Sequence, residues 1–195
     1  KILAQDLNQL DFSQIEEKLK TISPLTILVN NAGIYQQASI QDTTATLWED
    51  LFQTNLLATV ELTQFCWKIF TANKAGSIVN VSSTLGIKPI AGTSAYSALK
   101  AALVNWTLSL SIEGGPLNIR ANCVAPGIID TPIHPFHKLD ETAKKEVETN
   151  VSHIQLLKRL GKPEDVAESI FFLASEKSKF TTGSILHVDG GINIK

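Results

Sequence analysis

Five short apolar stretches divide the chain, and each has the length and composition of a β-strand. The run from Leu25 to Val29 contains no charged residue, and its continuous hydrophobicity is typical of a strand that is buried on both faces of a parallel sheet. The predicted strands span residues 2–4, 25–30, 77–81, 118–124 and 184–188.

Longer segments with apolar residues at helical spacing separate these strands. Thr46 and Glu49 have the spacing of a capping box at the start of one segment, and Pro163 is suited to the first turn of the last one. Helices are predicted over residues 12–21, 46–72 and 96–113, with the last helix beginning at residue 163. The polar segment 134–150, predicted to be partly helical, interrupts the regular alternation, as segments that contact substrates often do.

Alternation of strand and helix predicts an α/β fold with a mostly parallel sheet, in which ligands bind beyond the carboxyl ends of the strands. We expect one domain over residues 1–195, with a substrate-binding segment at 127–150 inside it.

The composition of the chain argues against nucleic acid and membranes as partners. The chain has 17 Lys and Arg against 19 Asp and Glu, a net charge of -2 that gives no basic face for nucleic acid. No apolar run approaches the roughly 18 residues of a membrane span, and the first residues lack the pattern of a signal peptide. Cys66 and Cys123 lack the spacing of a metal or disulfide motif, so we expect a cytoplasmic protein without a metal site. His134 and His137 have no third ligand near them in the sequence and are expected to line the substrate cleft.

A phenol and an ammonium are predicted to share one helix face, because Tyr96 and Lys100 lie four residues apart in a helical segment. A nearby cation favours the phenolate, so Lys100 is expected to lower the pKa of Tyr96 toward the range of a general acid or base. The alternative is an ordinary solvated pair on a helix surface.

Three loops at the same predicted sheet edge carry polar or glycine-containing signals. Ser83 follows one strand, residues 30–33 (Asn-Asn-Ala-Gly) follow another, and Pro126 and Gly127 follow a third. Each signal also has an ordinary reading as a cap or turn. Asn55 lies inside a predicted helix, where asparagine is a poor helix former, so it either makes a specific hydrogen bond or faces solvent.

Taken together, these motifs resemble the short-chain dehydrogenase/reductase family, in the single-domain form with a Tyr-x-x-x-Lys motif and a Rossmann-like, doubly wound, three-layer sheet. The resemblance runs over the whole chain. In chain order the motifs are Asp6-Leu7, Asn30-Asn31-Ala32-Gly33, Asn55, Ser83, Tyr96 with Lys100, Pro126-Gly127, Thr131, and Thr182-Gly183 with Val188-Asp189-Gly190-Gly191.

The resemblance implies an NAD- or NADP-dependent oxidoreductase that transfers a hydride between nicotinamide and a ketone or secondary alcohol. It implies that Tyr96 exchanges a proton with the substrate oxygen, that Ser83 hydrogen-bonds this oxygen, and that Lys100 also holds the nicotinamide ribose. Asn55 would hold a water that connects Lys100 to solvent.

The same resemblance implies a set of cofactor contacts. Asp6 and the Leu7 backbone would contact the adenine, and the turn from Asn30 through Ala32 to Gly33 would line the ribose and pyrophosphate. Ile129 and Thr131 would hold the nicotinamide carboxamide, and Pro126 and Gly127 would also contact the cofactor. It also implies a homotetramer or homodimer paired through the two long helices and the C-terminal strand.

One departure matters: the family's glycine-rich turn, which places the pyrophosphate at a helix N-terminus, does not occur in these 195 residues. Residue 1 corresponds to the third strand of the family, so its first two strand-helix units are missing. Their absence predicts that the strand at 25–30 lies at a sheet edge and promotes aggregation. We expect the sequence to be an incomplete part of a longer protein; the alternative is a true fragment that binds dinucleotide weakly and is inactive.

Other functions remain as alternatives. A non-catalytic dinucleotide-binding protein would not need Asn55, Ser83, Tyr96 and Lys100 together. An epimerase or lyase relative usually has a longer substrate domain, and an enoyl reductase relative has a wider spacing between Tyr and Lys. The residues that normally distinguish NAD from NADP lie in the missing part.

Overall fold

The computed structural model describes residues 3–21 and 24–194, apart from the side chains of Pro135 and His137. In the described part, four parallel strands form one sheet in the order β1-β2-β3-β4. The strands are β1 (Ile27–Asn30), β2 (Gly76–Val81), β3 (Ile119–Pro126) and β4 (Ile185–Val188). The α-helices are α1 (Phe12–Leu19), α2 (Ala45–Phe52), α3 (Ala58–Asn73), α4 (Ser94–Gly114), α5 (Glu141–Ile154) and α6 (Pro163–Ala174).

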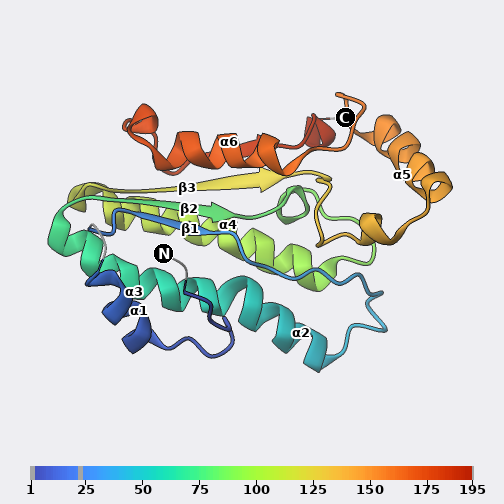
Figure 1. Cartoon of the computed structure of the whole chain (residues 1–195). Coiled ribbons are helices and arrows are strands. Elements are labelled where there is room, and N and C mark those ends of the chain that lie inside the picture. Colours follow the sequence, from blue (N-terminus) through green and yellow to red (C-terminus); the bar gives the residue numbers. More distant parts are fainter. Residues whose placement is uncertain (1–2, 22–23, 195) are drawn as a thin grey trace.

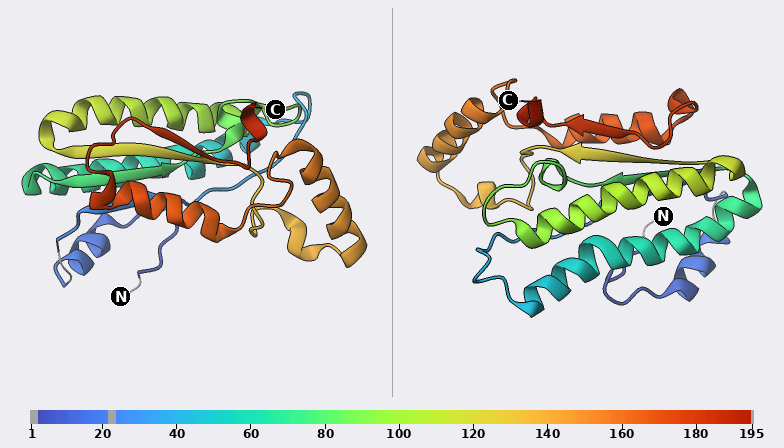
Figure 2. Two further views of the ribbon diagram at one scale, coloured as in Figure 1. Left: turned by 90° about the horizontal axis from the view of Figure 1, so that it is seen from above. Right: turned by 180° about the vertical axis from the view of Figure 1, so that it is seen from behind.

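Helices cover both faces of the sheet, which confirms the predicted three-layer α/β/α architecture. Helices α3 and α4 lie on one face and α6 lies on the other (Figure 1; Figure 2, right). Helix α5 lies beyond the carboxyl ends of β2 and β3 (Figure 1). No helix in the described residues is long and apolar enough to cross a membrane.

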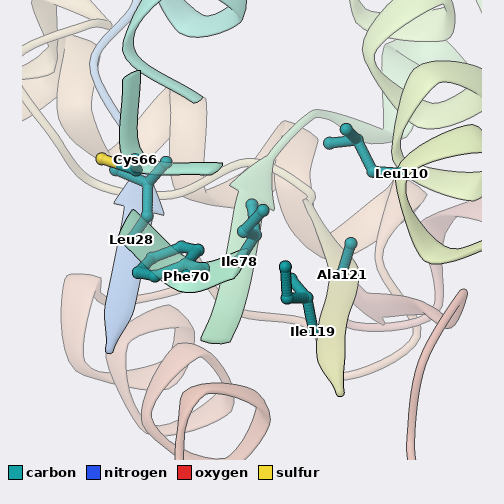
Figure 3. Packing of buried hydrophobic residues seen from close by; sticks show 7 residues of the cluster. All are labelled: Leu28, Cys66, Phe70, Ile78, Leu110, Ile119 and Ala121. Carbon is teal, nitrogen blue, oxygen red and sulfur yellow. The ribbon is translucent and has the colours of Figure 1, made fainter. Parts of the chain in front are cut away.

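Alternating side chains of the central strands build two separate cores. Ile78 faces α3 and α4, where it packs in a cluster with Leu28, Cys66, Phe70, Leu110, Ile119 and Ala121 (Figure 3). Its neighbour Val79 faces α6 and packs with Val124, Ile129, Val166 and Leu173. The period of two along a strand explains why adjacent residues belong to different layers.

The predicted strands at 25–30, 77–81, 118–124 and 184–188 are confirmed with small shifts at their ends, but the prediction at 2–4 is not. Residue 2 lies outside the described part, and Leu3 and Ala4 form no strand. The predicted helix at 46–72 is interrupted by a π-helical turn, Gln53–Leu57.

Strand β1 lies at the edge of the described sheet, as the sequence predicts. Leu28 is buried against α3, whereas Ile27 and Val29 on the opposite face are 44% and 39% exposed. The expectation that this strand is buried on both faces is therefore wrong for the described chain: its second face has no complete cover.

Candidate active site

A cavity of about 1180 Å³ opens beyond the carboxyl ends of β1, β2 and β3. Parallel strands bring the loops that follow them to one edge of the sheet, which is where ligands bind in such folds. The cavity is lined by residues of these loops, by α4 and by α6.

Helix α4 places Tyr96 and Lys100 in this cavity, both almost completely buried. The Lys100 ammonium donates a hydrogen bond to the Val81 carbonyl at 2.9 Å and lies 5.7 Å from the centre of the Tyr96 ring. Ser82 donates its hydroxyl proton to the Lys100 carbonyl at 2.8 Å, which ties this part of α4 to the end of β2. The pair is therefore a buried one, and the alternative of a solvated helix face is excluded.

Burial dominates the electrostatics of this pair. It raises the pKa of Tyr96 to about 12, while a hydrogen bond with Ser83 acts in the opposite direction. Burial lowers the pKa of Lys100 to about 8. The expected lowering of the Tyr96 pKa toward the range of a general acid or base is thus not met, because burial raises this pKa by more than the surrounding groups lower it.

Ser83 lies directly after β2, where it begins a short 3-10 turn, Thr84–Gly86. Its hydroxyl accepts a hydrogen bond from the Leu85 backbone at 3.1 Å. Ser83 lines the cavity together with Tyr96, so the structure brings together the hydroxyl and the phenol that the sequence singles out.

Asn55 occupies the π-helical turn between α2 and α3 and is 1% exposed. Its side-chain oxygen accepts from the Ile34 backbone N–H at 3.2 Å, and its amide donates to the Ile34 and Leu51 carbonyls. Of the two alternatives for this residue, the specific hydrogen bonds are confirmed. Asn55 fixes the loop that follows β1, and π-helical turns of this kind often occur at functional sites.

Two loops contribute the remaining predicted residues of the cavity. Ala32 and Gly33 follow β1, Pro126 is the last residue of β3, and Gly127, Ile129 and Thr131 follow it; all of them line the cavity. A Cβ atom at Gly33 would lie 2.7 Å from the Asn55 side-chain oxygen, and one at Gly127 would lie 2.8 Å from the Asp189 Cα. Both glycines therefore allow close packing that a larger residue would disturb.

Three predicted cofactor residues do not line the cavity. Asp6 is exposed and accepts a hydrogen bond from the Asn8 backbone, and Leu7 lies beside it. Asn30 is buried and donates its amide protons to Thr63 and Asn80. Its side chain is thus a structural link between β1, α3 and β2, and a contact of Asn30 with the cofactor stays a prediction.

Sequence reasoning missed Tyr35, which directly follows the segment held by Asn55. Its ring meets the Tyr96 ring edge-on, with centroids 4.9 Å apart and an interplanar angle of 85°. The His134 ring also meets the Tyr35 ring edge-on, with centroids 5.6 Å apart, and it stacks on the Phe136 ring with centroids 5.1 Å apart. His134 lines the cavity as expected, whereas the His137 side chain lies outside the described residues. The described residues contain no group of three potential metal-binding side chains.

A parallel sheet between helical layers, with a cavity at its carboxyl edge, defines a Rossmann-like α/β protein. A family model described as enoyl-(acyl carrier protein) reductase matches residues 6–193. The 3-oxoacyl-(acyl-carrier-protein) reductase FabG of Thermotoga maritima is 39% identical over 192 residues, covering 96% of this chain and 76% of the relative.

Solved structures agree. A short-chain dehydrogenase/reductase from Burkholderia thailandensis has a TM-score of 0.87 at 31% identity, covering 99% of this chain and 73% of that one. The structure of ElxO with NADP bound has a TM-score of 0.83 at 32% identity, covering 97% and 74%. The chain belongs to the short-chain dehydrogenase/reductase family.

Proposed function

We propose that the protein catalyses reversible hydride transfer between NAD or NADP and a ketone or secondary alcohol. The observation that carries this proposal is the gathering of Ser83, Tyr96 and Lys100 in one cavity at the carboxyl edge of the sheet. A protein that only bound dinucleotide would need neither a buried phenol nor a hydroxyl beside it.

Side chains of the protein would transfer the proton to and from the substrate oxygen. In the direction of reduction, the Tyr96 phenol gives its proton to the substrate oxygen, which Ser83 also holds by a hydrogen bond. The raised pKa of Tyr96 keeps the phenol protonated before the reaction, but it also makes the phenol a weak acid, so proton transfer requires a group that stabilises the phenolate. Lys100 lies beside the ring as a cation that stabilises the phenolate left behind. Asn55 positions the loop at Ile34 and, as a prediction, holds a water that leads to solvent.

The cavity fits the nicotinamide half of the cofactor. Lys100 offers an ammonium whose remaining protons suit ribose hydroxyls, and Gly33 and Gly127 bring backbone close to the ligand space. Pro126, Ile129 and Thr131 would hold the carboxamide, and Ala32 would border the ribose. Asp6 and Leu7 stay predictions for the adenine end. When bound, the cofactor supplies or accepts the hydride.

The reacting carbon would belong to a carbonyl group and not to an enoyl double bond, because the four-residue spacing of Tyr96 and Lys100 resembles the carbonyl reductases of the family. The 3-oxoacyl reductase from Thermotoga maritima supports this interpretation, and the ElxO complex supports the use of NADP. We further propose residues 127–150 as the substrate segment of a single domain, because this stretch includes the loop after β3 and most of α5, which lies beyond the strand ends (Figure 1).

The test is turnover of a ketone panel by the purified protein with NADH or NADPH, followed by the loss of reduced nicotinamide absorbance. Tyr96→Phe should lower kcat by about 10²-fold or more and leave cofactor Kd within about threefold, because only the transferred proton is lost. Lys100→Met should also lower kcat, whereas Lys68→Met, at an exposed lysine of α3, should not. Full activity of Tyr96→Phe would contradict the proposal, and cofactor binding without turnover by the wild type would favour the non-catalytic alternative.

A further inference from the structure

Tyr35 is the cavity residue whose position is best explained by a contact with substrate. The two hydrogen-bond contacts between Asn55 and the Ile34 backbone fix the chain just before it. The hydrogen bond from the Ala38 backbone to the Gly92 carbonyl, at 2.9 Å, fixes the chain just after it. The backbone on both sides of Tyr35 is therefore held in place, and its side chain lines the cavity.

Tyr35 connects two parts of the cavity that lie far apart in the sequence. Its ring contacts both Tyr96 and His134, and His134 stacks on Phe136. All four rings line the cavity. We call Tyr35, His134 and Phe136 the aromatic wall; it extends from the Tyr96 ring to the segment between β3 and α5.

The aromatic wall carries no charge near neutral pH. Burial raises the pKa of Tyr35 and lowers the pKa of His134, so the phenol stays protonated and the imidazole stays neutral. Leu85 and Ile90 add aliphatic surface to the same cavity. An uncharged wall of ring faces and edges beside the proton donor favours apolar or flat groups, which stack on aromatic rings.

We propose that Tyr35 is a specificity-determining residue, and that the aromatic wall selects carbonyl substrates with an apolar, preferably aryl, group next to the reacting carbon. This inference rests on the proposed function, since it concerns the substrate of the same site. It concerns recognition and not the chemical step, so Tyr35 is not a catalytic residue.

Two methyl ketones separate recognition from chemistry: acetophenone carries a phenyl group, and hydroxyacetone carries a hydroxymethyl group in its place. The wild type should prefer acetophenone by about tenfold or more in kcat/KM, the scale at which an apolar pocket discriminates. Tyr35→Ala should reduce this preference by about tenfold, mainly through the KM of acetophenone, with little change for hydroxyacetone. Tyr35→Phe should keep the preference, and His134→Ala should lower it in the same direction.

Phe180→Ala is the matched control, because Phe180 is fully exposed and lies outside the cavity. It should leave both ketones unchanged within about twofold. If Tyr35 only supports the Tyr96 ring, Tyr35→Ala will lower kcat equally for both ketones, and that result would overturn the proposal. A wild type that prefers hydroxyacetone would overturn it as well.

Binding gives a readout that does not depend on turnover. Saturation-transfer NMR should show the phenyl protons of acetophenone in contact with the wild-type protein, with about tenfold weaker binding to Tyr35→Ala. If the wild type reduces no ketone but this difference is seen, the proposed function fails and the recognition by Tyr35 stands. Equal affinity of wild type and Tyr35→Ala would refute the role of Tyr35 whether or not the protein is active.

Discussion

Lys100 keeps a four-carbon stem and an ammonium inside the protein, where only 4% of its surface reaches solvent. A positive charge in such a place costs free energy, because the bulk hydration it loses is only partly replaced by the Val81 carbonyl. Burial of the Lys100 ammonium thus lowers the stability of the folded protein, while it places the cation where the proposed chemistry needs it.

The stability of the protein should depend on pH through this residue. The folded-state pKa of Lys100 is about 8 against an ordinary value of 10.5, so the unfolded chain binds more protons between these two values. The cost of burying the ammonium is complete below pH 8 and disappears above pH 10.5. The wild type should therefore gain roughly 3 kcal/mol of unfolding free energy relative to Lys100→Met across this window.

Urea unfolding of both proteins at a series of pH values measures this difference. The difference is the informative quantity, because Cys66 and Cys123, whose pKa values burial raises to about 11, lower the stability of both proteins as the pH rises above the ordinary thiol pKa. A pH-independent difference between wild type and Lys100→Met would show that the ammonium is not desolvated as described.

At the scale of residues, the sequence predicts contacts between neighbours on one helix better than it predicts burial or contacts between distant segments. Four-residue spacing brings Tyr96 and Lys100 together because helix geometry fixes which side chains are neighbours. The pKa of Tyr96 was predicted in the wrong direction, since burial depends on how α4 packs against β2. The contact between Tyr35 and His134 joins residues almost a hundred positions apart, and no local pattern indicates it.

At the scale of elements, the turn at Gln53–Leu57 shows how one helix interruption organises a site. Asn55 lies in the π-helical turn and faces the loop after β1. There its side chain forms hydrogen bonds with both the N–H and the carbonyl of the Ile34 backbone. Gly33 packs directly against the Asn55 oxygen, so the loop and the turn form one unit.

Gly33→Ala should disrupt that unit. The added methyl would lie 2.7 Å from the Asn55 oxygen, so either the loop or the amide must move. We expect a loss of about 1–2 kcal/mol in unfolding free energy and a drop of about tenfold or more in kcat/KM, since small displacements at an active site are costly.

Gly115→Ala is the control for this prediction. No atom lies within 4 Å of a Cβ placed at Gly115, and its φ of -52° suits alanine. This variant should unfold like the wild type and retain its activity. Equal behaviour of the two alanine variants would mean that the packing around Gly33 is not tight.

Most elements were predictable because their signals are local. The helix at Pro163 begins where the sequence indicates, and the long α4 spans the predicted 96–113. The prediction at residues 2–4 fails for Leu3 and Ala4, since a short apolar run becomes a strand only when a neighbouring strand accepts its hydrogen bonds. The π-helical turn was signalled only by the unfavourable asparagine.

Arg120 on β3 closes the end of α6. Its guanidinium donates hydrogen bonds to the carbonyls of Leu173, Ser175 and Thr181 and to the Ser77 hydroxyl, at 3.0–3.1 Å. Arg120→Ala would remove these four hydrogen bonds, although each of the three carbonyls keeps a second donor, such as Ser178 for Leu173 and Ser175, and Asn122 for Thr181. It should lower the unfolding free energy by about 1–3 kcal/mol, measured by denaturant titration. Arg159→Ala should have a far smaller effect, because its ion pair with Asp165 lies at the surface. Similar losses in the two variants would rule out the capping role of Arg120.

At the scale of the whole molecule, the uncovered side of β1 is the least protected part of the sheet. Ile27 presents an exposed apolar side chain on a strand with one free edge, and such edges pair with other chains. Ile27→Lys should therefore slow aggregation of the 195-residue chain severalfold, as followed by light scattering during mild heating.

Ile40→Lys is the matched control, because Ile40 is 76% exposed in a loop away from the sheet. It adds the same charge without touching the edge of β1. An equal delay of aggregation in both variants would show that net charge, and not the strand edge, is responsible.

The position of α6 near the end of these 195 residues also affects when the cavity can form during synthesis of the chain. Val79 and Val124 on the sheet are buried by Val166 and Leu173 of α6. Val166 and Ile170 of the same helix also line the cavity. During synthesis on the ribosome, all the residues proposed for proton transfer therefore emerge before the helix that completes their surroundings. A nascent chain that stops before residue 163 carries Tyr96 and Lys100 but lacks α6 and the cavity wall that it forms, so the proposed activity should arise only after α6 has been synthesised.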